Sequence, residues 1–168
     1  MRTLYILRHA SAEAARPGSG DRDRALTSAG VLEAEAMGRF MAKAGLSCAA
    51  VASSSAERAR QTGEALLRAA AVPLKLEAVD ELYDASGEAM LRWLQTRFGQ
   101  EKSLLIVAHM PGVGELLSLL TTESAALGVA MQPCTLAAVD ADVTAWAGLD
   151  YGRGSLRLLL PVSLLMTA

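Results

Sequence analysis

The sequence predicts an α/β fold, a three-layer sandwich in which helices flank a mostly parallel central sheet. Two observations support this prediction. Short apolar segments alternate along the chain with longer segments whose apolar residues recur every three or four positions. The longer segments also begin or end at residues that are typical of helix termini, such as threonine, serine, proline and glycine.

The overall composition is that of a globular protein. With 168 residues, the chain is long enough to bury a full core, and we expect a single domain over residues 1–168. Hydrophobic residues make up 52% of the chain and charged residues 20%, which argues against disorder. The formal net charge of −2 provides no overall attraction to nucleic acid or to an anionic membrane. A bound anion would therefore need a local cluster of positive groups.

Two further features indicate a cytoplasmic protein. The sequence contains neither a signal-peptide pattern nor an apolar stretch long enough to span a bilayer. Its two cysteines, Cys48 and Cys134, lie in apolar surroundings and lack the CxxC spacing of many metal sites. We expect both to be buried thiols in a reducing compartment.

The first strand and the first helix are predicted from the N-terminal third of the chain. Residues 3–7 are apolar on both predicted faces, as in a strand that is covered on two sides. A helix follows the Gly-containing loop, with Thr27 as its N-cap and Gly45 at its end. The predicted apolar face of this helix carries Leu32, Ala36 and Phe40.

Two strands and a helix between them are predicted next. The strands cover residues 48–52 and, with a weaker pattern, residues 74–79. Ser54 and Glu57 have the spacing of a capping box, which predicts that Ser54 opens the second helix.

The second half of the chain predicts two helices and three strands. Ser86 is the expected N-cap of a helix that ends near Gly99. Residues 104–108 form a short apolar strand, and Pro111 suits the first position of the helix that follows. The last two predicted strands cover residues 135–139 and 155–160.

Polar residues that can carry out chemistry follow the first four predicted strands. Ligands in open α/β sheets bind beyond the carboxyl ends of the strands. In chain order, the residues delivered to that edge are Arg8 and His9, then Arg58, then Glu81, then His109. Both histidines of the chain are in this set, although the residues alone leave open that they are only structural.

These residue types suit phosphoryl transfer. Two guanidinium groups match the oxygens of a phosphate, and a neutral imidazole is a competent nucleophile near pH 7. Because phosphoryl transfer needs mainly positioning and charge neutralisation, the set suffices without a metal or another cofactor. Glu81 is a candidate general acid for the leaving group.

Other types of site have weaker support in the sequence. Two distant histidines without an HxH or HExxH pattern are poor evidence for zinc. Gly112 and Gly114 resemble the start of a dinucleotide-binding motif, but Leu117 occupies the position of the third glycine. No GxSxG elbow is present, and neither cysteine lies in a Cys-x5-Arg loop. We expect the run of charges at residues 21–24 to be a surface cluster, with Arg24 as an exception discussed below.

Five blocks of sequence, in order, resemble the histidine phosphatase superfamily. They are Leu7-Arg8-His9-Ala10, Arg24-Ala25-Leu26-Thr27, Ser54-Ser55-Ala56-Glu57-Arg58-Ala59-Arg60-Gln61-Thr62, Glu81-Leu82, and Val107-Ala108-His109-Met110-Pro111-Gly112. Within the superfamily, the chain is most similar to the short SixA-type phosphohistidine phosphatases. The resemblance implies a phosphoglycerate mutase-like fold.

The resemblance also implies residue roles. His9 matches the nucleophile that becomes phosphohistidine, and Arg8, Arg58 and His109 match the rest of the phosphate pocket. Arg24 matches a position that can provide an additional phosphate contact. Glu81 aligns with the acid of the mutase-like branch, although short members of the superfamily do not necessarily use it.

The implied activity is that of a metal-independent phosphatase acting on phosphohistidine in proteins. Two alternatives remain open at this point: hydrolysis of small phosphomonoesters, and a non-catalytic phosphate-binding domain on the same fold. Only about fifty residues separate Arg58 from His109, which leaves little room for a large lid and favours a protein substrate.

Overall fold

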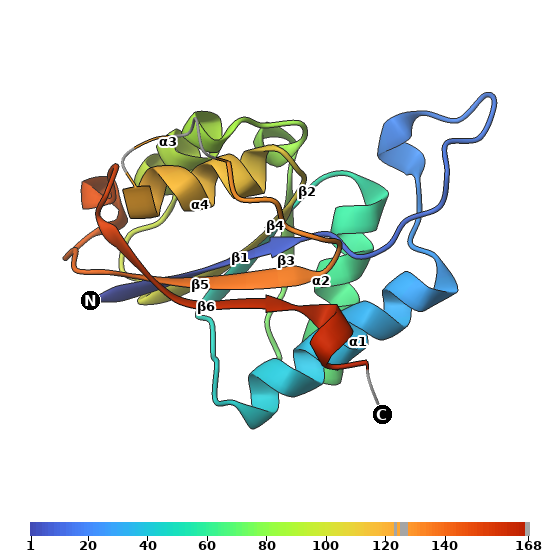
Figure 1. The fold of residues 1–168 in the computed structure, drawn as a ribbon, viewed down its shortest axis with the longest axis horizontal. Coiled ribbons are helices and arrows are strands. Elements are labelled where there is room, and N and C mark those ends of the chain that lie inside the picture. Colours follow the sequence, from blue (N-terminus) through green and yellow to red (C-terminus); the bar gives the residue numbers. More distant parts are fainter. Residues whose placement is uncertain (123, 125–127, 167–168) are drawn as a thin grey trace.

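Six strands form one mixed sheet in the computed structural model, which describes residues 1–122, 124 and 128–166 (Figure 1). The strands are β1 (Arg2–Arg8), β2 (Ala50–Ser54), β3 (Leu76–Val79), β4 (Ser103–Ala108), β5 (Thr135–Ala141) and β6 (Gly154–Pro161). Their order in the sheet is β3-β2-β4-β1-β5-β6. The first four in this order are parallel, whereas β5 and β6 are antiparallel to their neighbours. The prediction of a mostly parallel sheet is confirmed.

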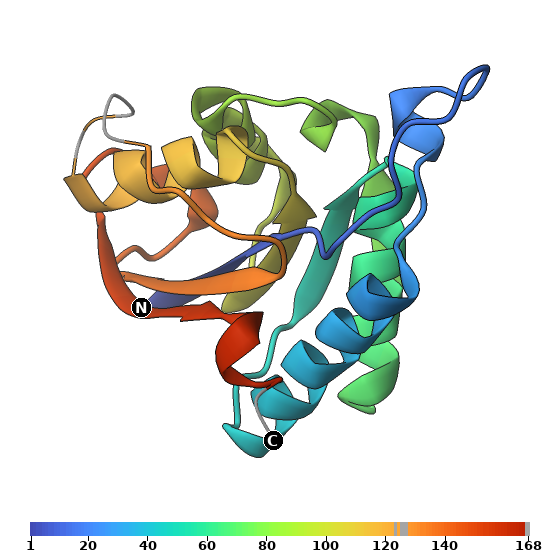
Figure 2. The same cartoon turned by 45° about the vertical axis from the view of Figure 1, so that its right-hand side comes forward.

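Helices cover both faces of the sheet. They are α1 (Ser28–Lys43), α2 (Glu57–Ala69), α3 (Gly87–Arg97) and α4 (Gly112–Thr122). Figures 1 and 2 show α1 and α2 on one face and α3 and α4 on the other, which confirms the three-layer arrangement. Within the described ranges, no helix is both long enough and apolar enough to cross a bilayer.

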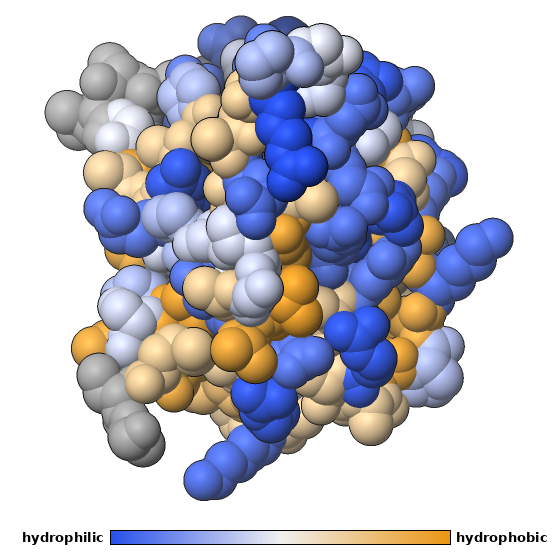
Figure 3. Space-filling model, turned by 90° about the vertical axis from the view of Figure 1, so that its right-hand side faces the viewer, coloured by the Kyte–Doolittle hydropathy of each residue, from blue (hydrophilic) through white to orange (hydrophobic). Residues whose placement is uncertain are grey.

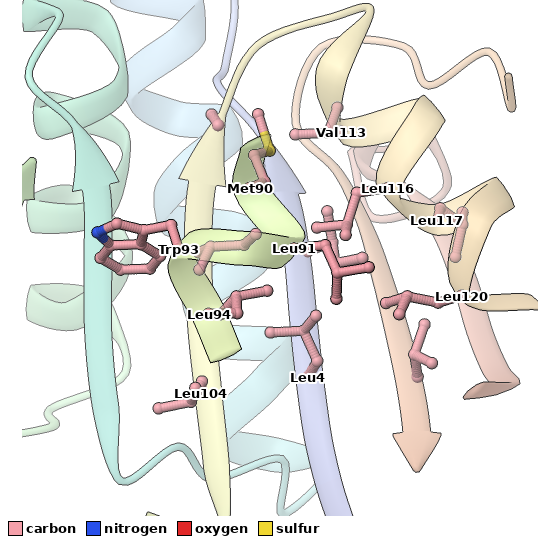
Figure 4. Close-up of a cluster of buried hydrophobic side chains, with 14 of the residues drawn as sticks. Leu4, Met90, Leu91, Trp93, Leu94, Leu104, Val113, Leu116, Leu117 and Leu120 are labelled. Atoms are coloured by element: carbon pink, nitrogen blue, oxygen red, sulfur yellow. The ribbon is translucent and has the colours of Figure 1, made fainter. Parts of the chain in front are cut away.

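The core consists of two apolar layers, one on each face of the sheet. Side chains of β1 and β4 contribute to both layers because successive residues of a strand point to opposite faces. In one layer, Leu4 and Leu104 face the apolar side chains of α3 and α4 (Figure 4). This burial on both faces explains why the central strands are continuously apolar in sequence.

Several predicted helix ends are confirmed. The Thr27 hydroxyl accepts a hydrogen bond from the backbone N–H of Gly30 at 2.9 Å, and the Ser86 hydroxyl accepts one from Ala89 at 3.2 Å. Gly45 follows α1 with a φ of +67°, a left-handed conformation that favours glycine.

The predicted apolar face of α1 is partly wrong. Leu32 is 53% exposed, and α1 instead buries Ala34, Met37 and Met41. At Gly38, α1 lies so close to the backbone of Leu66 in α2 that this contact decides which side of the helix faces inward.

The prediction that Ser54 caps α2 is also wrong. Ser54 is the last residue of β2, and α2 begins at Glu57 after Ala56, whose side chain makes no capping bond. The Ser54 hydroxyl accepts a hydrogen bond from the N–H of Ala56 at 3.2 Å, before the first turn of α2, and it also contacts His109, as described below. Strands β2 and β3 each begin two residues later than predicted.

The contact at Gly38 leads to a stability prediction. Gly38→Ala places a Cβ against the carbonyl group of Leu66, so we expect the free energy of unfolding to fall by about 1–3 kcal/mol, although alanine is the better helix former. Urea denaturation measures the change. Gly99→Ala is the matched control, because its Cβ would meet no atom within 4 Å. Equal stability of the two variants would contradict the packing argument.

Candidate active site

His9 and His109 lie side by side at the carboxyl edge of the sheet. They directly follow β1 and β4, which are neighbouring parallel strands with Arg8 opposite Ala108. The backbone N–H of His9 donates to the carbonyl oxygen of Ala108 at 3.0 Å, which extends the pairing by one residue. As a result, the centroids of the two imidazole rings are only 5.1 Å apart.

The tautomer of His9 follows from one hydrogen bond. Its Nδ1 lies 2.7 Å from the carbonyl oxygen of Ala10, and a carbonyl oxygen can only accept. Nδ1 therefore carries the proton in the neutral ring, which leaves the lone pair on Nε2. Burial is the main cause that lowers the pKa of His9 to about 4. The charges of Arg58, Arg8 and Arg24 act in the same direction, and the hydrogen bond to the Ala10 carbonyl opposes them. At neutral pH the ring is uncharged, and its Nε2 can act as a nucleophile.

His109 is more deeply buried than His9. The residue is 7% exposed, its Nε2 lies 2.7 Å from the Ser54 hydroxyl, and its ring packs against that of Tyr83 in a T-shaped arrangement. Burial lowers the pKa of His109 to about 3, and the nearby charge of Arg58 contributes in the same direction. The Ser54 hydroxyl that the sequence indicated as a helix cap thus orients this imidazole.

Two guanidinium groups flank the histidines, those of the half-buried Arg8 and of the buried Arg58. Arg8 donates from Nη1 to the carbonyl oxygen of Met131 at 2.7 Å. Arg58, in the first turn of α2, donates to Asp21 twice, to its carbonyl oxygen at 2.6 Å and to its carboxylate at 2.9 Å. Both arginines also contribute to the lowered pKa of each histidine, which places their charges close to both rings.

Three buried nitrogens of this site have no hydrogen-bond partner in the described part of the chain. They are Nε of Arg8, Nε of Arg58 and Nδ1 of His109. Leaving such groups unpaired is costly, because each has lost its bonds to water. An oxyanion placed among them would supply the missing acceptors and offset the positive charge. The arrangement therefore suits the binding of a phosphoryl group beside the Nε2 lone pair of His9.

Two short 3-10 helices approach each other beside the site. One is η1 (Asp21–Asp23), in the loop after β1, and the other is η2 (Asp80–Leu82), after β3 (Figure 2). Arg22 forms a salt bridge with Asp80 at 2.8 Å, and its guanidinium lies over the ring of Tyr83, 4.4 Å from the centroid. The Tyr83 hydroxyl donates to the Asp21 carboxylate at 3.1 Å. These contacts hold the loop after β1 in place.

Arg24 lies in the same loop. It donates from Nε to the carbonyl oxygen of Glu13 at 2.7 Å and from Nη1 to the carboxylate of Asp21 at 2.9 Å. Its charge also contributes to the lowered pKa of His9. Arg24 is thus close enough to influence the site, and its contact with a phosphate stays a prediction.

Glu81 lies apart from the histidines. It is an exposed residue of η2, and no hydrogen bond joins its side chain to His9 or His109 in the described ranges. A hydrogen bond to Glu77 is the main cause that raises the pKa of Arg97. The negative charge of Glu81 raises this pKa to a smaller extent. The proposed role of Glu81 as a general acid stays a prediction.

Asp21 and Tyr83 are site residues that the sequence did not reveal. Asp21 belongs to an alternating run of acidic and basic residues, a pattern that usually marks a solvated surface. Its partner Arg58 is 37 residues away, and Tyr83 is 62 residues away. No local sequence signal indicates contacts over such distances.

The two cysteines do not resemble catalytic nucleophiles. Burial raises the pKa of the Cys48 thiol to about 11, and it also raises that of Cys134. Neither thiol forms a disulfide, and the raised pKa values keep both protonated at neutral pH. Cys134 is buried as expected, whereas Cys48 is only partly buried. In the described part of the chain, no three His, Cys, Asp or Glu side chains are grouped to hold a metal ion.

Comparison with protein families gives one match. The model of the histidine phosphatase superfamily (branch 1) matches residues 4–88, just over half of the chain. This segment contains Arg8, His9, Arg58 and Glu81, whereas His109 lies beyond it. Among curated proteins, none matches the chain.

Solved structures match over nearly the whole chain. A protein from Agrobacterium tumefaciens that carries the name phosphohistidine phosphatase SixA has 31% sequence identity and a TM-score of 0.79, with 95% of this chain and 97% of that chain covered. A protein of the same name from Nakamurella multipartitia has 28% identity and a TM-score of 0.76, with 95% of each chain covered. An α-ribazole-5′-phosphate phosphatase from Escherichia coli has 18% identity and a TM-score of 0.69, with 94% and 95% covered, which shows a shared fold alone.

The lowered pKa values of the two histidines predict how stability depends on pH. Because the folded-state pKa values, about 4 and about 3, are below the ordinary value of 6.5, the unfolded chain binds protons first as the pH falls. The stabilisation is fully present above pH 6.5 and is lost below it. We expect each histidine to contribute a slope of up to about 1.4 kcal/mol per pH unit.

Urea denaturation between pH 6.5 and 5.0 tests this expectation, since most carboxyl groups stay ionised in that range. The double variant His9→Asn/His109→Asn is the comparison, because it cannot titrate at these two positions. A wild-type slope no steeper than that of the double variant would show that the imidazoles are not held neutral.

Proposed function

The chain belongs to the histidine phosphatase superfamily and is a phosphatase, and we propose that it hydrolyses phosphohistidine in proteins, without a metal ion, through a phosphoryl intermediate on His9. The observation that carries the proposal is the juxtaposition of a neutral, oriented His9 imidazole with buried cationic donors that lack partners. A module that only bound phosphate would have no need of a nucleophile held in this way.

The first step of the proposed reaction transfers the phosphoryl group to the enzyme. The lone pair on Nε2 of His9 attacks phosphorus in line with the leaving group. The bond between phosphorus and the substrate nitrogen breaks, and its electron pair stays on that nitrogen. Arg8, Arg58 and His109 hold the phosphoryl oxygens and neutralise their charge in the transition state.

The second step releases inorganic phosphate. A water molecule attacks phosphorus, the bond to Nε2 of His9 breaks, and the electron pair returns to the ring, while the protons of the water stay on the released phosphate. Because the hydrogen bond from Nδ1 to the Ala10 carbonyl can persist throughout, the ring keeps its orientation for the next cycle.

Two observations support a protein substrate. Between Arg58 and His109 the chain forms only the rest of α2, then β3, η2, α3 and β4, so this segment adds no separate lid. The similar proteins from A. tumefaciens and N. multipartitia carry the name of a phosphohistidine phosphatase. We also propose a cytoplasmic location, where phosphorylated histidine proteins are accessible and free thiols persist.

The covalent intermediate can be tested by labelling. Incubation with radiolabelled phosphoramidate should give a phosphoenzyme that is labile in acid and stable in base, and His9→Ala should give none. His109→Asn is the control, because it keeps the nucleophile and should label about 10²-fold or more slowly. Persistence of the label in His9→Ala, or neither label nor turnover in the wild type, would refute the proposal.

Glu81→Gln tests whether the enzyme needs a general acid. We expect kcat/KM for a histidine-phosphorylated peptide to change by less than about threefold, because a protonated leaving imidazole needs no further proton. Glu77→Gln is the matched control, since the carboxylates of Glu77 and Glu81 both raise the pKa of Arg97. A specific loss of about 10²-fold or more in Glu81→Gln would instead identify Glu81 as the acid.

A further inference from the structure

Asp21 is the residue to which the polar side chains around the phosphoryl site converge. Its carboxylate accepts hydrogen bonds from Arg24 at 2.9 Å, from Arg58 at 2.9 Å and from Tyr83 at 3.1 Å. Its backbone carbonyl oxygen accepts a further bond from Arg58 at 2.6 Å. Asp21 thus places a negative charge directly beside a guanidinium that is expected to hold the substrate's phosphoryl group.

The carboxylate lies between the buried part of the site and solvent. The side chain of Arg58 is 8% exposed, whereas that of Asp21 is 50% exposed. The side of the molecule that carries this loop is largely hydrophilic in its upper part, as Figure 3 shows. We expect a substrate that enters from solvent to place its phosphoryl group inward, toward the unpaired nitrogens, with its leaving group on the solvent side, where Asp21 lies.

A negative charge at that level discriminates among leaving groups. The carboxylate repels the oxygens of a phosphate dianion, so a simple phosphomonoester gains no binding energy from the carboxylate. A phosphorylated imidazole differs, because its second ring nitrogen can carry a proton and donate it in a hydrogen bond to a carboxylate. Such a bond favours the protonated ring.

We propose that Asp21 is a specificity-determining residue that accepts a hydrogen bond from the distal ring N–H of phosphohistidine and thereby favours this substrate over phosphomonoesters. The inference rests on the proposed function, and it adds a residue that recognises the leaving group. It assigns Asp21 no proton transfer.

The proton balance of the reaction fits this role. The protonated ring leaves as neutral imidazole: the electron pair of the broken bond stays on the nitrogen that carried phosphorus, and the proton stays on the distal nitrogen. An alkoxide leaving group would need a proton from the enzyme. Asp21 cannot supply it at neutral pH, because hydrogen bonds from Arg24, Arg58 and Tyr83 hold its pKa at about 2.

The test compares Asp21→Asn with the wild type on two substrates, a histidine-phosphorylated peptide and p-nitrophenyl phosphate. We expect the ratio of kcat/KM for the peptide to kcat/KM for the ester to fall by about tenfold or more. We also expect inorganic phosphate to inhibit the variant more strongly, because a repulsive charge has been removed. Asp21→Glu should restore part of the ratio.

Asp23→Asn is the matched control. Asp23 lies in the same 3-10 helix, but its carboxylate accepts a bond only from the backbone of Gly20 in the described ranges, so its removal should leave the ratio unchanged. If Asp21 merely positions Arg58, Asp21→Asn will slow both substrates equally and weaken inhibition by phosphate, which would overturn the inference. If the wild type hydrolyses the ester but not the peptide, the proposed function itself is wrong.

Discussion

The parallel pairing of β1 with β4 is the constraint on which the site depends. It aligns Arg8 with Ala108, and the added hydrogen bond from His9 to Ala108 brings the two imidazoles to a centroid distance of 5.1 Å. Both strands are apolar on two faces, and apolar layers backed by helices enclose them. The rigidity of the histidine pair is therefore a property of the core, because the rings follow directly from its most buried strands.

The second constraint is the concentration of positive charge at the carboxyl edge. Arg8 and Arg58 lie close enough to both histidines to lower their pKa values, and burial adds to the effect. The result is an uncharged imidazole among permanent cations, which is the state that the proposed attack on a phosphoryl group requires. The carboxylate of Asp21 compensates part of this positive charge. Because it lies on the exposed side, the buried nitrogens of Arg8, Arg58 and His109 remain free to bind an anion.

Much of this organisation was predictable from sequence. Thr27 and Ser86 were identified as N-caps because capping depends on bonds to residues three positions away. The placement of His9 and His109 at one edge followed from a general property of parallel sheets. The expected face of α1 was partly wrong because the close contact of Gly38 with Leu66, a residue of another helix, decided which side is buried. Ser54 was misassigned because it is the last residue of β2. Its hydroxyl lies against Nε2 of His109, 55 residues away, and accepts from the N–H of Ala56, which precedes the first turn of α2.

The sequence by itself determined the α/β class and the order of the elements, because these depend on hydrophobic periodicity. It also placed Arg8, His9, Arg58 and His109 near one edge of the sheet, because their positions depend on spacings along the chain. Only the tertiary structure decided how those residues are surrounded. The Nδ1 proton of His9, the Ser54–His109 contact and the convergence of Arg24, Arg58 and Tyr83 on Asp21 depend on distances and on burial. These electrostatic effects arise between residues that are remote in sequence and come together only when the loop after β1 lies against α2 and η2.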